Sequence, residues 1–491
     1  MGRRPDRYAG FTAVPLQDPP AAAAELRRCV HELGFVGTLI NGYTYVRFAE
    51  SGHPNAGQPA DDRREGTMRT TRYQTMVVAV LATLVILAGC QAGGSGSTAA
   101  GNPRTPVVLF PAFHLTKLLI TVHDQVVAPE CPRSGSFEDW FRNDHPSTIF
   151  NQVCQDKLLT LRYNPSPSIP MPQRFSNQQG VTVEVKYYGT TDSAPFYEPL
   201  YKTLESTGYR RNRDIRVAGY DARLTPDIGE FLQRTQKIIE DTYRDNGDRP
   251  VHLIGHSNGP LYAHYLLTHT TRAWRAQYIH GFTSLAGNFP GQGLLYPVLF
   301  TGLNIEDFGY PATKDNAASS ARLYQTAPST YLSASDPTVF GDRETVIEDA
   351  ATGRTYTPRD YRKLNTDANL GWAKDMADYY VGFDKIAEPG SFPDVDVYAE
   401  KGSGVPTVVG ARLDNLASGQ IVTASTKLFS RDGDGNQEDI TNNAVLAWRA
   451  MRCFHFSLTD NPGVDHFALP SNPNMLHRLL VDLTLPPHTC P

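Results

Sequence analysis

A glycine–x–serine–x–glycine motif, Gly255 to Gly259, stands where the hydrophobic pattern of the chain changes. The preceding run, Val251–Ile254, is short and mostly apolar, which suits a buried strand, and apolar residues recur at helical spacing over 261–266. A strand, a tight turn and a helix in this order are typical of a nucleophile elbow, which would expose Ser257. Glycine suits both ends of the motif because a Cβ atom there would collide with neighbouring backbone. The alternative is a glycine-rich turn with an incidental serine, but the flanking strand and helix favour a catalytic serine.

A serine nucleophile needs a general base and a carboxylate that orients the base. Where the order along the chain is serine, acid, histidine, the best base is His466, in a loop before the last helix. The best acid lies in a turn that holds both Asp432 and Asp434. By contrast, His455 lies in a strand pattern and His477 inside the last helix, so we expect these two to be structural or solvated.

Two backbone N–H groups are expected to bind the oxyanion. One belongs to Asn258, and for the second we predict Tyr188, at an earlier junction of strand and loop. The alternative for Tyr188 is an ordinary surface turn. The acidic spacing around Asp434 partly matches a calcium loop, but Gln437 replaces the required glycine and Asn443 the required glutamate. No metal or other cofactor is therefore predicted.

The composition is that of a globular protein. The chain has 491 residues, of which 40% are hydrophobic and 20% charged, so it can bury a substantial core. The net charge is −5 and no basic run stands out, so nucleic acid is not a predicted partner. The six cysteines follow no zinc-binding spacing.

Residues 1–67 differ from the rest of the chain. Two strand patterns, 11–14 and 35–40, flank an Ala-rich helical pattern and so predict one βαβ unit, followed by a polar linker over 51–67. The stretch Gly10–Gly42 resembles a fragment of the amidohydrolase-type decarboxylases, which are metal-dependent barrels. One such unit cannot close a barrel of ~250 residues, and the fragment holds no metal-binding constellation. We interpret it as an inactive fusion or a gene-model artefact.

Residues 68–90 have the build of a secretory signal. Arg69 and Arg72 precede an uncharged apolar run, Met76–Leu87, which is shorter than the ~20 residues that span a bilayer. The run ends in a lipobox-like sequence whose Cys90 is a possible lipidation site. We therefore predict an exported protein, secreted or anchored at the cell envelope, or in a lysosome-like compartment in a eukaryote. A Gly/Ser linker follows over 91–105.

Alternating strands and helices predict an α/β-hydrolase fold, with a mainly parallel sheet covered by helices on both faces. The core is predicted over 106–287 and again over 391–491, with a cap inserted over 288–390 and a lid loop over 131–154. In an exported protein, Cys131 and Cys154 are expected to close that loop as a disulfide. The predicted strands are Val107–Phe110, Val181–Lys186, Asp214–Gly219, Tyr278–Leu285, Val395–Ala399 and Gln420–Phe429, and the main helices are Phe196–Ser206, Ile228–Tyr243 and Asn474–Leu483.

From about Pro106 to Leu485 the chain resembles the lecithin–cholesterol acyltransferase family, which includes lysosomal phospholipase A2. The matching segments are Val251–Gly259, Gly219–Arg223, Phe282–Gly287, Asp432–Gly435 and Asp465–His466. The resemblance implies that Asp434 is the triad acid and that Cys131 and Cys154 are the paired cysteines of a membrane-facing lid loop.

The sequence also departs from the family pattern. Ala399 stands where the first cysteine of a second family disulfide is expected, and a different bridge between Cys453 and Cys490 is an open alternative. Tyr187 replaces a glycine beside the predicted oxyanion residue, and Ala112 replaces a glycine after the first strand. Asn436 and Gln437 replace the usual Thr-Val after the acid.

These observations predict a serine-dependent lipid acyl-ester hydrolase or O-acyltransferase that works through an acyl-enzyme. Its expected partners are a phospholipid or other acyl-ester lipid, water or a lipophilic alcohol as acceptor, and a membrane surface. A first alternative is an esterase or lipase that acts on soluble or neutral esters with the same triad. A second is an inactive binding protein anchored at the cell envelope.

Overall fold

The computed structural model describes residues 11–13, 37–39, 104–139, 152–302, 314–383, 389–418, 427–450 and 453–488. The chain divides into two units, Met1–Gly94 and Ser95–Pro491. In the first unit, strands β1 (Phe11–Ala13) and β2 (Gly37–Leu39) pair in parallel, as expected for the strands of a βαβ unit. The helix predicted between them and the segment 68–90, with Cys90, lie outside the described residues. Within the described ranges, none of the helices has the length and apolar character that a membrane crossing requires.

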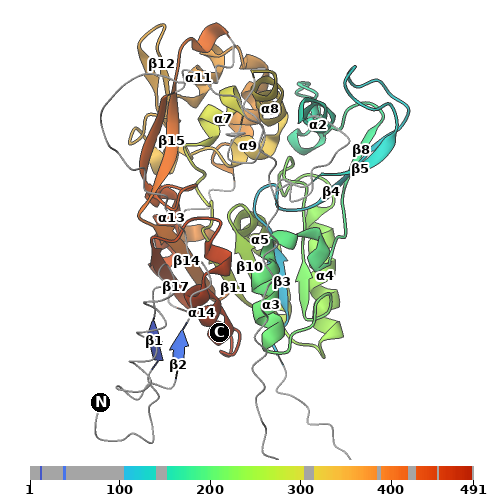
Figure 1. The fold of residues 1–491 in the computed structure, drawn as a ribbon, viewed down its shortest axis with the longest axis vertical. Coiled ribbons are helices and arrows are strands. Elements are labelled where there is room, and N and C mark those ends of the chain that lie inside the picture. The colour runs from blue at the N-terminus through green and yellow to red at the C-terminus, as the bar shows by residue number, and fades with distance from the viewer. Residues whose placement is uncertain are drawn as a thin grey trace, which may run out of the picture. The chain divides into compact units, whose positions relative to one another are not determined.

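The second unit is built on a six-stranded sheet in the order β17-β14-β11-β10-β3-β9, and every neighbouring pair is parallel (Figure 1). Its strands are β3 (Val107–Phe110), β9 (Ile215–Val217), β10 (Val251–His256), β11 (Ile279–Leu285), β14 (Val397–Ser403) and β17 (Phe456–Pro462). The strands β3, β10, β11 and β14 are buried along their whole length, which is typical of a parallel sheet covered on both faces. The predicted α/β-hydrolase fold is confirmed.

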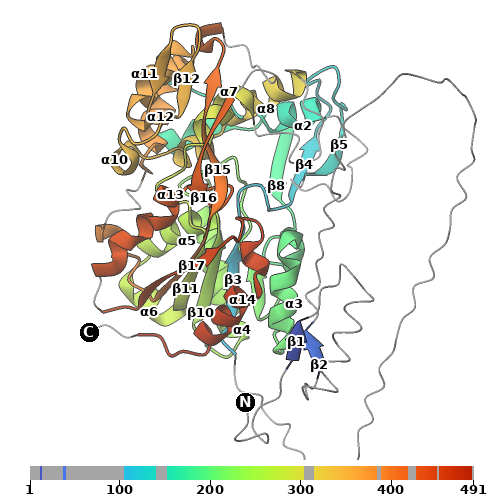
Figure 2. The same cartoon turned by 60° about the vertical axis from the view of Figure 1, so that its left-hand side comes forward.

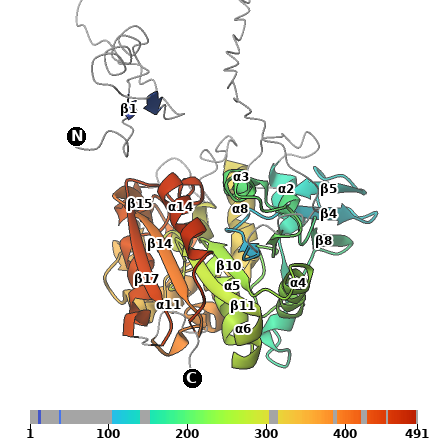
Figure 3. The ribbon, with the colours of Figure 1, turned by 90° about the horizontal axis from the view of Figure 1, so that it is seen from below.

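Helices cover both faces of this sheet (Figure 3). Because side chains of a strand alternate between the two faces, Val107 and Leu109 of β3 join one buried cluster, with residues of α3 and α14. Val108 and Phe110 join the other cluster, with residues of α4 and α5. The covering helices are α3 (Glu198–Ser206) and α14 (Pro473–Asp482) on one face, and α4 (Phe231–Asp245), α5 (Gly259–Thr268) and α6 (Arg272–Tyr278) on the other.

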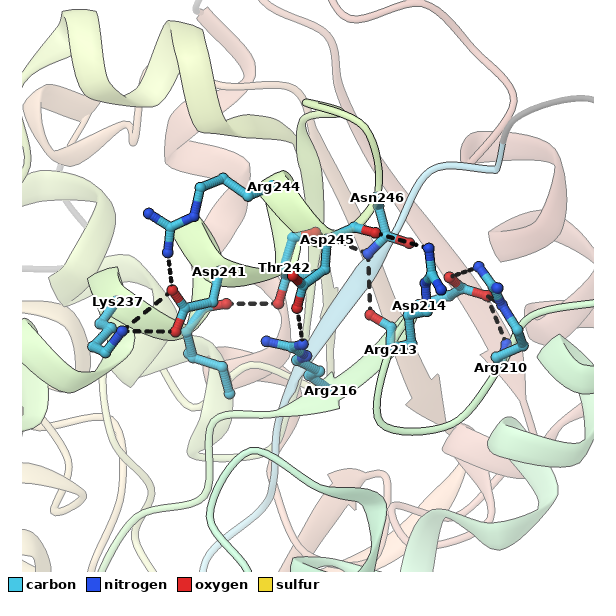
Figure 4. A network of polar contacts seen from close by, with 11 residues as sticks. Arg210, Arg213, Asp214, Arg216, Lys237, Asp241, Thr242, Arg244, Asp245 and Asn246 are labelled. Atoms are coloured by element: carbon cyan, nitrogen blue, oxygen red, sulfur yellow. Dashed lines mark hydrogen bonds and ion pairs between the residues drawn. The ribbon is translucent and has the colours of Figure 1, made fainter.

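Polar contacts fasten the edge strand β9 to the end of α4 (Figure 4). Arg216 of β9 pairs with Asp245 at the end of α4. The side chain of Asn246 donates to the Arg213 carbonyl at 3.1 Å. Arg210 pairs with Asp214 at 2.9 Å just before the strand. Each partly exposed pair contributes little by itself, but the contacts of Arg216 and Asn246 together hold β9 against the end of α4.

A separate antiparallel sheet, β5-β4-β8, carries the lid region. Its strands are β4 (Leu118–Val122), β5 (Gly135–Asp139) and β8 (Val181–Val185). The predicted strand 181–186 therefore lies outside the parallel sheet. Its half-exposed pattern suits an antiparallel strand with one solvated face. Cys131 and Cys154 form the predicted disulfide, which joins the β4–β5 connection to α2 (Gln152–Leu159). Cys453 is also disulfide-bonded, and Cys490 lies outside the described residues.

The cap has its own mixed sheet, in the order β13-β12-β15-β16, and several short helices (Figure 2). Its elements are α7 (Leu295–Thr301), α8 (Lys314–Thr326), α9 (Pro328–Leu332), α10 (Pro337–Phe340), β12 (Ile347–Asp349), β13 (Arg354–Tyr356), α11 (Tyr361–Asp367), α12 (Lys374–Tyr380), β15 (Val405–Leu413) and β16 (Lys427–Gly433). Because β15 and β16 belong to this sheet, the cap takes in part of the segment that the sequence assigned to the core. It also contains more regular structure than its Pro-rich sequence predicts.

Helix α2 of the lid packs on α8 of the cap through a buried carboxyl group. The Ser319 hydroxyl donates to Asp156 at 2.7 Å. Burial raises the pKa of the Asp156 carboxyl to about 7, although the hydroxyl contact opposes this shift. The folded protein therefore binds a proton here that the unfolded chain, with its ordinary pKa near 3.8, has already released at neutral pH.

Because the pKa of Asp156 is raised in the folded protein, we expect the free energy of unfolding to depend on pH. The stabilising contribution is complete below the unfolded pKa and is lost as the pH rises through about 7. We expect the free energy of unfolding of the wild type to fall relative to that of Asp156→Asn by on the order of 2–3 kcal/mol between about pH 5 and pH 8. Urea titrations of both proteins at each pH measure this difference. Asp432→Asn, at an exposed position, is the control, and a pH-independent difference for Asp156→Asn would contradict the prediction.

Candidate active site

The turn between β10 and α5 has the strained geometry expected of a nucleophile elbow. Ser257 has a φ of 61°, a left-handed conformation that non-glycine residues seldom adopt. A Cβ atom on Gly255 would lie 2.7 Å from the Pro260 nitrogen, and one on Gly259 would lie 2.1 Å from the Phe110 carbonyl oxygen. Both positions therefore require glycine, as the motif predicts.

The structure selects Asp434 over Asp432 as the partner of His466. The His466 Nδ1 atom lies 2.9 Å from Asp434 Oδ2, and both side chains are buried, whereas Asp432 is exposed. Asp434 Oδ1 accepts the N–H groups of Gln437 at 2.6 Å and Asn436 at 3.0 Å. The sequence of this turn partly matches a calcium loop, but in the structure the Asp434 carboxylate accepts two backbone N–H groups and contacts His466.

These contacts determine the charge of Asp434. Burial by itself raises the pKa of the Asp434 carboxyl, but the nearby His466 ring and the N–H groups that the carboxylate accepts outweigh burial, so that the pKa lies below its usual value. The carboxyl group is therefore ionised at neutral pH. An anion fixed against Nδ1 holds the proton of the imidazole on that nitrogen, which leaves Nε2 as the basic nitrogen.

One pocket brings Ser257, Asn258 and His466 together. The remaining lining residues are Ala112, Phe113, Asn436 and Phe467 from the core and Gln292, Leu294, Leu295 and Ser333 from the cap. The pocket lies where β10 and β3 end, so the cap closes over the carboxyl ends of the parallel strands. Apart from a few polar groups, its walls are apolar.

Tyr188 does not line this pocket. Its ring packs under Arg234 of α4, whose guanidinium carbon lies 4.1 Å from the ring centroid. The next residue, Gly189, donates its N–H to the Val217 carbonyl, so this loop lies beside the end of β9. In the sheet order, β9 is two strands away from β10. The neighbour of the elbow is instead the loop after β3, which contains Ala112 and Phe113. The sequence marks only Ala112, as a departure from the family pattern after the first strand, and does not mark Phe113.

Sequence reasoning missed the residues that connect the elbow to the cap. The Asn258 side chain donates to the Ser333 hydroxyl at 2.8 Å and accepts from the Asn288 amide at 2.8 Å. All three are buried. Nothing in the sequence around Asn288 or Ser333 marks them, because their partner lies 30 or 75 residues away.

Comparisons with known proteins show which families this chain is similar to. A family model described as lecithin:cholesterol acyltransferase matches residues 178–331, which include the elbow. Phosphatidylcholine-sterol acyltransferase of Gallus gallus is 29% identical over 293 residues, which are 58% of this chain and 66% of that protein. Lysosomal phospholipase A and acyltransferase of Mus musculus is 29% identical over 439 residues, which are 85% of this chain and 98% of that protein. These matches confirm the similarity of this chain to the lecithin:cholesterol acyltransferase family.

Two further comparisons concern the N-terminal segment and the fold. An amidohydrolase family model matches residues 1–99, in agreement with the resemblance of the first segment of the chain. Among solved structures, a chain described as the crystal structure of the Tle4–Tli4 complex aligns with a TM-score of 0.48 and 11% identity, over 78% of this chain and 99% of that chain. No function is assigned from that likeness.

The segment Gly219–Arg223 joins the core to the lid. Arg223 is buried and pairs with Asp221. Its Nη1 atom donates to the Leu159 carbonyl, at the end of α2, at 2.7 Å, and Nη2 also donates to Asn177 at 3.0 Å. The segment thus positions the lid and does not itself line the pocket.

Proposed function

We propose that this protein is a serine-dependent lipid acyl-ester hydrolase and O-acyltransferase. The observation that carries the proposal is one pocket that holds Ser257 on a strained elbow together with His466, whose other nitrogen contacts the buried Asp434. Acyl transfer through a serine requires three groups: a hydroxyl, a histidine whose Nε2 atom is free to take a proton, and a carboxylate that orients the histidine.

The reaction proceeds in two halves. Ser257 Oγ attacks the ester carbonyl carbon while His466 Nε2 takes the hydroxyl proton, and the carbonyl π electrons pass to the oxygen. The tetrahedral intermediate collapses to an acyl-serine, and the imidazolium returns its proton to the departing alcohol. In the second half, His466 deprotonates water or an alcohol, which attacks the acyl carbon of the acyl-serine. The imidazolium then returns the proton to Ser257 Oγ as the bond to the acyl carbon breaks, which releases an acid or a new ester and restores the free enzyme. Asp434 stabilises the imidazolium in both halves.

The oxyanion is held by two backbone N–H groups. Asn258, the residue after the nucleophile, supplies one of them. The second comes from the loop after β3. Within that loop, the Ala112 N–H already donates to the Tyr197 hydroxyl at 2.8 Å, so we assign the role to Phe113, which lines the pocket. This assignment replaces Tyr188.

A lipid substrate is supported by the surroundings of the pocket. Phe113, Leu294, Leu295 and Phe467 give it apolar walls. The cap limits the access of water, and transfer to an alcohol in competition with water depends on such exclusion. Val126, in the connection next to the lid disulfide, is 62% exposed and could contact a membrane surface. Two relatives are named for acyl transfer and phospholipase A activity, which supports a phospholipid as acyl donor. Export, through the segment 68–90, is part of this proposal.

A fluorophosphonate probe and two substrates test the proposal. We expect the probe to label the wild type and not Ser257→Ala, and the variant to lose ester cleavage by ~10⁴-fold or more. Phospholipid vesicles should be cleaved faster than a short-chain nitrophenyl ester at equal ester concentration. Preference for the soluble ester would favour an esterase. Full activity in Ser257→Ala would refute the mechanism, and a wild type inert to the probe would point to a binding protein.

A further inference from the structure

His256, the residue before the nucleophile, makes contacts with both of its ring nitrogens. It is fully buried. Its Nδ1 atom lies 3.0 Å from the Tyr197 hydroxyl, and its Nε2 atom lies 3.0 Å from the His466 carbonyl oxygen. The same Tyr197 hydroxyl accepts the Ala112 N–H at 2.8 Å. These contacts connect four segments that are far apart in the chain.

The direction of every proton in this network follows from its partners. A carbonyl oxygen only accepts, so the His256 Nε2 atom carries the hydrogen that it donates to His466. Burial lowers the pKa of His256 well below its ordinary value, so the ring is neutral and Nδ1 has no hydrogen. The Tyr197 hydroxyl must therefore donate to Nδ1, while its oxygen accepts from Ala112.

We propose that Tyr197 and His256 are positioning residues. They hold the loop after β3 and the general base, His466, in place relative to Ser257. The inference rests on the proposed function. On one side, the network fixes Ala112, whose neighbour Phe113 supplies the second oxyanion donor. On the other side, it fixes the backbone of His466, whose own N–H donates to the Asp434 carbonyl at 2.7 Å.

The position of His256 makes this connection direct. It is the last residue of β10, so the strand that carries Ser257 also carries the centre of the network. Tyr197 lies immediately before α3, on the face of the sheet opposite to α5. A displacement of ~1 Å in a reacting group can cost about 10²-fold in rate. Fixing donor and base through one buried ring therefore has a measurable effect on catalysis.

The first test removes a single hydroxyl. Tyr197→Phe leaves the Ala112 N–H without its acceptor and the His256 Nδ1 atom without its donor. We expect kcat for ester cleavage to fall about 10- to 100-fold, with KM within about twofold of the wild type. Tyr201→Phe is the matched control, because Tyr201 is equally buried and donates to the Ala194 carbonyl at 3.0 Å, outside the network. Its midpoint of thermal unfolding should fall as for Tyr197→Phe, with kcat unchanged.

A second pair of variants tests whether His256 belongs to the same unit. Gln at this position keeps an N–H that can donate to the His466 carbonyl, whereas Leu keeps none. We therefore expect His256→Gln to retain about tenfold more kcat than His256→Leu. Adding Tyr197→Phe to His256→Leu should slow the enzyme by less than about twofold, because a network that acts as a unit is lost only once.

Three results would overturn the inference: a wild-type kcat in Tyr197→Phe, an equal loss of kcat in Tyr201→Phe, or full additivity in the double variant. These results count against the inference only if the Ser257→Ala variant is inactive, because the measured activity then comes from Ser257. Activity that survives Ser257→Ala would instead refute the proposed function.

Discussion

Asp434→Asn is expected to lower kcat for ester cleavage by ~10⁴-fold, while Asp432→Asn leaves it within about twofold. An amide at position 434 can donate to the imidazole, which would put the proton on Nε2 and remove the base that Ser257 needs. It also cannot stabilise the imidazolium that forms when the serine proton is taken. Asp432, two residues earlier, is exposed, and its carboxylate accepts the neighbouring Gly433 N–H at 3.0 Å.

Steady-state hydrolysis of one ester by the two variants measures this difference. Both substitutions remove one negative charge from the same turn, so the comparison controls for net charge and for the turn itself. Fluorophosphonate labelling should slow in parallel for Asp434→Asn. An equal loss in both variants, or none in Asp434→Asn, would show that the contact with His466 does not act in catalysis.

Gly259→Ala is expected to give the largest loss of stability. The added Cβ atom would lie 2.1 Å from the Phe110 carbonyl oxygen and 2.8 Å from that of Pro111. These atoms belong to the backbone of β3 and the loop after it, so no side-chain rotation relieves the overlap. The strand or the helix must move, and we expect a cost of about 3 kcal/mol. That is a large part of the 5–15 kcal/mol by which domains are typically stable.

Gly371→Ala provides the matched control, because a Cβ atom there meets nothing within 4 Å. We expect its midpoint of urea unfolding to equal that of the wild type, with a change below about 0.5 kcal/mol. For Gly259→Ala we expect a lower midpoint or little soluble protein. A wild-type midpoint in Gly259→Ala would mean that β3 and α5 are not packed as closely as described.

The elbow could be predicted from the sequence because its chemistry is local. Gly255, Ser257 and Gly259 lie within five residues, and the strand and helix beside them have clear hydrophobic periods. The choice between Asp434 and Asp432 could not be made from the residues alone, since both lie in one polar turn. Burial and the direction of the side chain decide it, and only the resemblance to a family favoured Asp434 beforehand.

The second oxyanion donor could not be predicted in this way, and Tyr188 lies away from the pocket for a topological reason. The residue that supplies this N–H depends on which strand lies beside β10. Pairing between strands more than a hundred residues apart places β3 there, with Phe113 in the following loop. Tyr188 precedes a contact with β9, and the local sequence of its Tyr-Gly turn looks equally suitable.

The extent of the cap could not be predicted from the sequence either. Strand β15 was missed because Pro406 and Gly410 interrupt its β pattern. It is formed nevertheless, through antiparallel pairing with β16 and a register shift between Val408 and Gly410. Such long-range pairing overrides local propensity.

The β15–β16 hairpin begins directly after β14, and β16 ends at Gly433, so that the next residue is Asp434, the proposed triad acid. The cap hairpin and the proposed triad acid are therefore continuous in the backbone. A change in the position of this hairpin would also displace Asp434, and with it the carboxylate that contacts His466.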